Sequence, residues 1–341
     1  MLRRYSLPDP RFLPLGRHDP REKESCLWWS GSGVRVHIAC RQMEIEATVN
    51  ARDHAAWMGV MVDGAPVARF PLINGTHRYP VLAGMESTVS HDITILRDSQ
   101  LTYDEDGPVV LNAVYTDGEP AAPALRPLLL EFVGDSLTVG EGCVGPRSGD
   151  EWRTVFISHM PAFPTLVAEE MNAEKRVIAL GGWGASQGWD LNPDSRIGRI
   201  YGQLCGPTPG GNVPADFPER PADAVVINLG TNDATAMSSL EGEKKTEAEA
   251  YLTECAENLL CQVRARNPHA HIVWAYGLCG WQVKDQLEKA VAKRRADGDG
   301  RVHYLALTDC DGDVGSRWHP SRAAHRRVAR EICDELKKLL T

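Results

Sequence analysis

Residues 128–136 read Leu-Leu-Leu-Glu-Phe-Val-Gly-Asp-Ser. An apolar run that stops at a glycine is typical of a short strand buried in a parallel sheet. Open α/β sheets place their ligands at the carboxyl ends of such strands. Ser136 therefore lies where the nucleophile of such a sheet would be expected.

The rest of the second half of the chain alternates between two patterns. Further apolar runs occupy residues 176–180, 223–229, 271–276 and 302–306. Between and after them lie stretches with helical spacing, of which the last carries Val328, Ile332, Leu336 and Leu340. Alternating strands and helices predict an α/β domain, with a parallel sheet covered by helices on both faces.

The first third of the chain has the period of β-strands. Met43, Ile45, Ala47 and Val49 alternate with polar or small neighbours, as in a half-buried strand. Asp63-Gly64 lies between two apolar runs and predicts a tight hairpin. Several short strands with turn residues and no long helical period predict an all-β sandwich.

A stiff connector separates these two halves. Residues 117–127 read Asp-Gly-Glu-Pro-Ala-Ala-Pro-Ala-Leu-Arg-Pro, which is rich in proline and poor in apolar periodicity. We place the domain boundary here, with a β-sandwich accessory domain over residues 1–122 and a catalytic domain over residues 123–341.

Composition excludes several classes of function. The chain has 341 residues and a net charge of −9, which argues against nucleic acid or an anionic membrane as the main partner. Its nine cysteines include no Cys-x-x-Cys pair, so zinc-ribbon and thioredoxin-like chemistry are disfavoured. No apolar stretch has the length of a signal peptide or membrane span. These features predict a cytoplasmic location and reduced thiols.

Four short blocks fall at the predicted ends of strands or just before the last helix. They are Gly134-Asp135-Ser136-Leu137, Gly181-Gly182-Trp183-Gly184, Gly230-Thr231-Asn232-Asp233 and Trp318-His319-Pro320. Each block alone has a structural interpretation: a helix N-cap, a tight turn, a turn-stabilising asparagine or a packed histidine. The four together, in order and at element boundaries, favour catalysis.

Acyl transfer needs a nucleophile, a base and hydrogen-bond donors for the developing oxyanion. Ser136 supplies the hydroxyl and His319 the base, which is partly neutral near pH 7. The backbone N–H groups of Ser136 and Gly182 and the side-chain amide of Asn232 are candidates for the oxyanion hole. This scheme needs no metal and no cofactor.

The four blocks resemble those of the SGNH (GDSL-type) hydrolases, a family named for its serine, glycine, asparagine and histidine. The corresponding residues here are Ser136, Gly182, Asn232 and His319. The resemblance covers roughly residues 128–340. It implies a flavodoxin-like three-layer α/β/α fold and metal-free ester hydrolysis.

The first third resembles the jelly-roll domain of carbohydrate esterase family two. The similar stretches are Gly16-Arg17, Trp29-Ser30-Gly31-Ser32-Gly33 and Val62-Asp63-Gly64. Enzymes of that family join such a domain to an SGNH domain and remove O-acetyl groups from plant polysaccharides. The resemblance implies an acetylated oligosaccharide, of xylo- or manno-type, as the substrate.

One position departs from the SGNH pattern. The superfamily usually has an aspartate three residues before the catalytic histidine, where it fixes the tautomer of the ring. Ser316 occupies that position here, and Asp313 is the nearest acid upstream. The Ser316 hydroxyl, Asp313 or a backbone carbonyl are the candidate partners of His319. We favour a Ser–His dyad with a main-chain partner, as in some members of family two.

Two tryptophans adjoin the predicted site. Trp183 follows Gly182 and Trp318 precedes His319, so their rings either bind sugar faces or pack the loops. Two alternative functions also stay open. One is an SGNH lipid esterase or thioesterase, and the other is a non-catalytic sugar-binding protein, which the serine at position 316 suggests.

Overall fold

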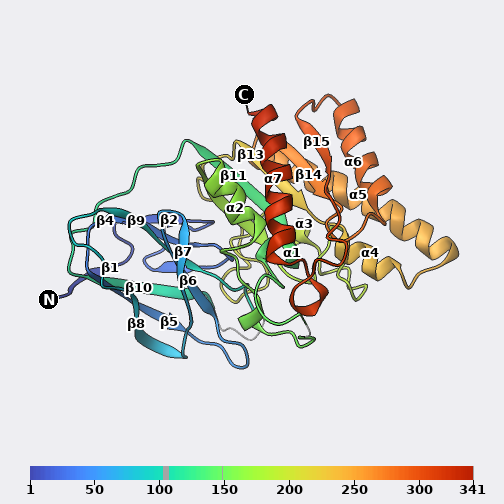
Figure 1. The fold of residues 1–341 in the computed structure, drawn as a ribbon. Helices are drawn as coiled ribbons and strands as arrows, with labels where there is room; N and C mark the ends of the chain where they lie inside the picture. The colour runs from blue at the N-terminus through green and yellow to red at the C-terminus, as the bar shows by residue number, and fades with distance from the viewer. Residues whose placement is uncertain (103–106, 148, 341) are drawn as a thin grey trace. The chain divides into compact units, whose positions relative to one another are not determined.

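The computed structural model describes residues 1–102, 107–147 and 149–340 (Figure 1). The chain divides into two compact units. The first unit comprises Met1–Arg126 with two later segments, Arg153–Val155 and Gln203–Phe217. The second unit comprises Pro127–Trp152, Phe156–Gly202 and Pro218–Thr341.

The first unit contains two antiparallel sheets. One sheet has the order β1 (Arg3–Ser6), β10 (Val109–Thr116), β5 (Gln42–Val49), β8 (Gly75–Ala83), with β3 (Ser25–Leu27) also paired to β10. The other has the order β2 (Leu13–Leu15), β4 (Gly33–Ile38), β9 (His91–Arg97), β6 (Trp57–Val62), β7 (Ala65–Pro71). Buried apolar side chains from both sheets form one core, as in the predicted sandwich.

Local sequence explains much of this unit. Met43, Ile45 and the other alternate residues of β5 are buried while their neighbours are not. The Asp63-Gly64 pair joins β6 to β7 with φ of +48° and +79°, which is the left-handed geometry of a hairpin turn. Both predictions from the sequence are thus confirmed.

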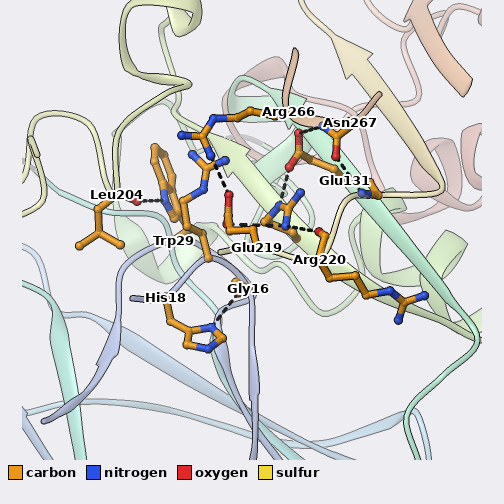
Figure 2. Close-up of polar contacts among 12 residues, drawn as sticks. Gly16, His18, Trp29, Glu131, Leu204, Glu219, Arg220, Arg266 and Asn267 are labelled. Atoms are coloured by element: carbon orange, nitrogen blue, oxygen red, sulfur yellow. Dashed lines mark hydrogen bonds and ion pairs between the residues drawn. The ribbon is translucent and has the colours of Figure 1, made fainter. Parts of the chain in front are cut away.

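Side chains of the first unit hold the returning segment Gln203–Phe217. The indole Nε1 of Trp29 donates to the Leu204 carbonyl at 2.8 Å (Figure 2). The buried Arg17 guanidinium donates to the Gln203 carbonyl at 2.9 Å. Two residues of the family-like N-terminal stretches therefore act in folding, because each satisfies a carbonyl of a segment without secondary structure of its own.

The second unit is built on a parallel five-stranded sheet. Its order is β12 (Ala173–Ala179), β11 (Leu128–Gly134), β13 (Ala224–Asn228), β14 (His271–Tyr276), β15 (Val302–Ala306). Numbered within the unit, this is the 2-1-3-4-5 order of flavodoxin-like folds. The α/β class expected from alternating strands and helices is confirmed, and β11 lies inside the sheet.

Helices cover the sheet. They are α1 (Ser136–Val139), α2 (Phe163–Glu170), α3 (Ile197–Ile200), α4 (Thr231–Met237), α5 (Gly242–Arg266), α6 (Lys284–Ala296) and α7 (Arg322–Leu339). Apolar residues of α2 and α7 pack on one set of strand side chains, which includes Leu130 and Phe132. The alternate strand residues Val225 and Trp274 are also fully buried, and α5 and α6 pack against β14.

An ionic cluster lies within this core. Glu131 of β11 is fully buried and accepts from Arg176 Nε and Tyr201 Oη, each at 2.5 Å. Asn267 donates to the same carboxylate at 3.5 Å (Figure 2). The partners come from β12, α3 and the end of α5, so the cluster ties three segments to the central strand.

Two buried histidines lie where α7 meets α2. His325 of α7 accepts the backbone N–H of Phe163 on its Nδ1 at 3.2 Å and stacks on the Phe163 ring. Burial lowers the pKa of His325 to about 3, and it also lowers the pKa of His159 well below its usual value. Both rings are therefore neutral in the folded protein, and His325 is structural, as expected.

Within the described residues, no helix has the length and apolar character needed to cross a bilayer.

We expect Glu131→Ala to lower the free energy of unfolding by about 3–5 kcal/mol, because it leaves the Arg176 guanidinium buried without its main partner. Urea denaturation measures the loss. Glu170→Ala is the control: it removes an exposed ion pair with Lys337 and should cost less than about 1 kcal/mol. Equal losses would contradict a special contribution from the buried cluster.

We expect His325→Gln to weaken the loss of stability in acid. Below pH ~6.5 the unfolded chain binds a proton on this histidine, whereas the folded chain binds one only near pH 3. Stability from this site is thus complete above pH ~6.5 and falls by about 1.4 kcal/mol for each pH unit below it.

Between pH 7.5 and 5.0 the wild type should therefore lose about 2 kcal/mol more than the variant. Urea titrations at both pH values measure this difference. Identical losses in the two proteins would show that His325 titrates normally in the folded state.

Candidate active site

Ser136 begins α1 directly after β11. The side chain of Asp135 caps this helix, accepting the Leu137 N–H at 3.0 Å. The serine therefore stands at the carboxyl end of an interior strand, where α/β sheets place their ligands. Its side chain is mostly buried but keeps 7% exposure.

His319 faces this serine. Its Nε2 lies 3.0 Å from Ser136 Oγ, and its Nδ1 lies 2.9 Å from the Arg317 carbonyl oxygen. Because a carbonyl only accepts, the Nδ1 proton is directed to it and Nε2 is left to accept the serine hydroxyl. This is the tautomer that a general base requires.

A strained loop aims that carbonyl at the ring. Arg317 and Trp318 have φ of +53° and +59°, in the left-handed region that costs side chains on the order of 1–3 kcal/mol each. Hydrogen bonds hold the loop in place, from Arg317 N–H to the Gly149 carbonyl at 2.8 Å and from Gly315 N–H to the His319 carbonyl at 2.7 Å.

The two side chains considered as partners of His319 are engaged elsewhere or make no bond. Asp313 accepts the Ser321 hydroxyl at 2.5 Å. Ser316 Oγ is buried and makes no hydrogen bond to any described residue. The ring is oriented by main chain, in the place where a triad would use a carboxylate.

Gly182 follows β12 by two residues and has φ of +83°. This conformation favours glycine, and a Cβ here would lie 3.2 Å from the Trp189 ring. The backbone of the second block is therefore narrow where it passes Trp189. Its place in the oxyanion hole stays a prediction.

Asn232 of α4 links the first three blocks. Its side-chain Nδ2 donates to Asp135 Oδ2 at 3.1 Å and to the Trp183 carbonyl at 2.9 Å. Both amide hydrogens thus have partners in the protein. Donation to an oxyanion would require one of these bonds to open when substrate enters.

Buried acids hold the loops around the site. Asp233 accepts the backbone N–H groups of Ala185 and Ser186, at 2.9 and 2.8 Å, and the Ser186 hydroxyl at 2.6 Å. Burial raises the pKa of Asp233, and burial together with the charge of Asp233 raises the pKa of Asp135 to about 7. Both acids stabilise loops, as the sequence suggested.

The tryptophans divide by exposure. Trp183 is 7% exposed, so its ring packs in the protein, whereas Trp318 is 72% exposed. Trp189 and Trp281 are also largely exposed, and the Trp189 ring lies beside Gly182. Among the sequence candidates for sugar contact, exposure therefore favours Trp318 and adds weight to Trp189.

Sequence reasoning missed one acid at this site. Glu141 is 3% exposed, its Oε2 lies 3.8 Å from His319 Nε2, and its Oε1 pairs with the Arg317 guanidinium. It lies five residues beyond Ser136 and outside the four blocks, so no spacing rule pointed to it. No group of three or more potential metal ligands occurs among the described residues.

The profile of the GDSL-like lipase/acylhydrolase family matches residues 132–327, which include Ser136, Gly182, Asn232 and His319. The chain belongs to this family. A second profile, the N-terminal domain of carbohydrate esterase family two, matches residues 15–123. This GDSL-like hydrolase thus carries the two-domain combination that the sequence suggested.

Known proteins resemble the whole of this GDSL-like hydrolase. Cellulase/esterase CelE of Acetivibrio thermocellus is 26% identical over 97% of the chain, but the match spans only 40% of CelE. An acetylxylan esterase/glucomannan deacetylase of Cellvibrio japonicus is 23% identical over 97% of the chain and 90% of that protein. The structure of Est2A, an acetyl xylan esterase from Butyrivibrio proteoclasticus, matches with a TM-score of 0.94 and 25% identity over 99% of each chain.

We expect Asn232→Ala to lower kcat for 4-nitrophenyl acetate by about 10²–10³, the usual cost of losing one oxyanion donor. Thr235→Ala, on the exposed side of the same helix, is the control and should keep wild-type kcat. An unchanged kcat in Asn232→Ala would remove the amide from the oxyanion hole and leave it a structural link.

Proposed function

We propose that the protein is a serine esterase that removes O-acetyl groups from carbohydrates, with acetylated xylo- and manno-oligosaccharides as substrates. The observation that carries the proposal is the 3.0 Å contact between Ser136 Oγ and His319 Nε2, with the ring held in the basic tautomer. The family-two N-terminal domain and the deacetylases among the similar proteins support carbohydrate as the alcohol side of the ester.

The geometry supports a two-step reaction. Ser136 Oγ attacks the acetyl carbonyl while His319 Nε2 takes the hydroxyl proton. The tetrahedral intermediate collapses as the imidazolium returns that proton to the departing sugar oxygen. Water, deprotonated by the same nitrogen, then attacks the acetyl-serine, and acetate and free serine are formed.

Oxyanion stabilisation falls to groups at the strand ends. The Ser136 and Gly182 N–H groups are the proposed main-chain donors, and Asn232 is the side-chain donor. The Asp135 and Asp233 carboxylates hold the loops that carry these groups, so the donors are preorganised before substrate binds.

Exposed aromatic side chains suit a sugar substrate. Trp318 and Trp189 come from segments next to His319 and Gly182, and both offer ring surface to solvent. Sugar C–H groups pack on such π faces while the hydroxyls stay free to hydrogen-bond. A long acyl chain would instead need an apolar channel.

We expect the protein to release acetate from acetylated xylo- or manno-oligosaccharides, and Ser136→Ala to abolish the release. Enzymatic acetate determination measures it, and labelling by a fluorophosphonate probe should disappear in the same variant. Activity that rises with acyl length on 4-nitrophenyl esters would favour a lipid esterase or thioesterase. Oligosaccharide binding with neither turnover nor labelling would favour a non-catalytic binding protein.

A further inference from the structure

Glu141 is a buried acid beside the dyad that the reaction described above does not use. It follows Gly140, the C-cap of α1, and its backbone N–H donates to the Ser136 carbonyl at 3.0 Å. The short helix that carries the nucleophile therefore also places this carboxylate.

The two oxygens of Glu141 have different partners. Oε1 pairs with the Arg317 guanidinium, and Oε2 lies 3.8 Å from His319 Nε2. Arg317 is also the residue whose carbonyl accepts from His319 Nδ1. One carboxylate thus anchors the side chain of the orienting residue and faces the ring that this residue orients.

Close packing fixes this arrangement. The next residue, Gly142, has φ of +82°, and a Cβ there would lie 2.5 Å from the His319 Cβ. Such an approach leaves no room for a side chain, so the backbone after Glu141 rests directly against the histidine. The distance between the carboxylate and the ring is therefore set by main-chain contact as well as by the ion pair.

We propose that Glu141 is a positioning residue that supplies the negative charge missing from the Nδ1 side of His319. In a triad, a carboxylate at Nδ1 stabilises the imidazolium that forms when the serine loses its proton. Here Nδ1 faces a neutral carbonyl, and the charge comes from the Nε2 side. The role rests on the proposed serine-esterase function and adds a charge partner to the same site.

Other charged or titratable groups surround this acid and the ring. The Arg317 cation shares the carboxylate and so reduces its effect on His319. Asp135, whose pKa is raised to about 7, also interacts with Glu141, and its own charge near neutral pH is therefore partial. His325, which faces His319 from α7, is neutral, so Glu141 and Arg317 are the full charges that decide the balance.

This balance predicts opposite effects for two substitutions. Glu141→Gln removes the negative charge, so His319 should lose its proton more readily and the acid limb of the kcat/KM profile should move to lower pH, by about half to one unit. The plateau should fall about 10- to 100-fold, because the imidazolium of the transition state is less stabilised.

Arg317→Met keeps the orienting carbonyl and frees the carboxylate from its competing cation. The acid limb should then move to higher pH. Glu247→Gln, an exposed acid-to-amide change in α5, is the matched control and should leave both plateau and limb unchanged.

The experiment measures kcat/KM for 4-nitrophenyl acetate from pH 4.5 to 8.5 for the wild type and the three variants, with folding checked by circular dichroism. Limb shifts of opposite sign support the proposal. Loss of rate with unmoved limbs, or shifts of the same sign, would overturn it, since a purely structural pair would behave in that way.

Two features keep the test decisive. If Glu141→Gln fails to fold, the direction of the shift in Arg317→Met still decides, because a structural role predicts none. Since the probe carries no sugar, failure on acetylated oligosaccharides overturns the proposed substrate class and leaves the result on Glu141 standing.

Discussion

The hydrogen bond between Ser136 Oγ and His319 Nε2 is the contact on which the rest of the second unit depends. It joins the end of β11 to the loop before α7, two segments that are 183 residues apart in the chain. The parallel sheet makes this possible, because it brings the carboxyl ends of its strands to one edge. The buried cluster around Glu131 and the packing of α7 on α2 keep those two segments at a constant separation.

The replacement of a triad acid by a main-chain carbonyl changes what the protein must build. A carboxylate orients the histidine and also stabilises its charge, whereas a carbonyl does only the first well. The cost of the arrangement is visible in the left-handed backbone at Arg317 and Trp318. The ion pair with Glu141 lies on this same segment, so orientation of the ring and the local charge depend on one residue, Arg317.

Several motif residues act through the loops. Asn232 and Asp233 bond to the first and second blocks, and Asp135 caps α1, so the blocks form one connected network before any substrate is present. In the first unit Trp29 and Arg17 similarly fix the returning segment. Recurrent residues of a motif thus reflect folding requirements as well as chemistry, and a substitution at Asn232 affects both.

The sequence by itself determined the α/β and β-sandwich classes, the Asp63-Gly64 hairpin and the four blocks, because each depends on local periodicity or on residue types at strand ends. Only the tertiary structure decided what orients His319, since every residue has a carbonyl and a main-chain partner leaves no mark in the side-chain pattern. It also separated buried Trp183 from exposed Trp318 and placed Glu141 beside the ring. These are distances between segments remote in the chain, and they follow from packing rather than from spacing.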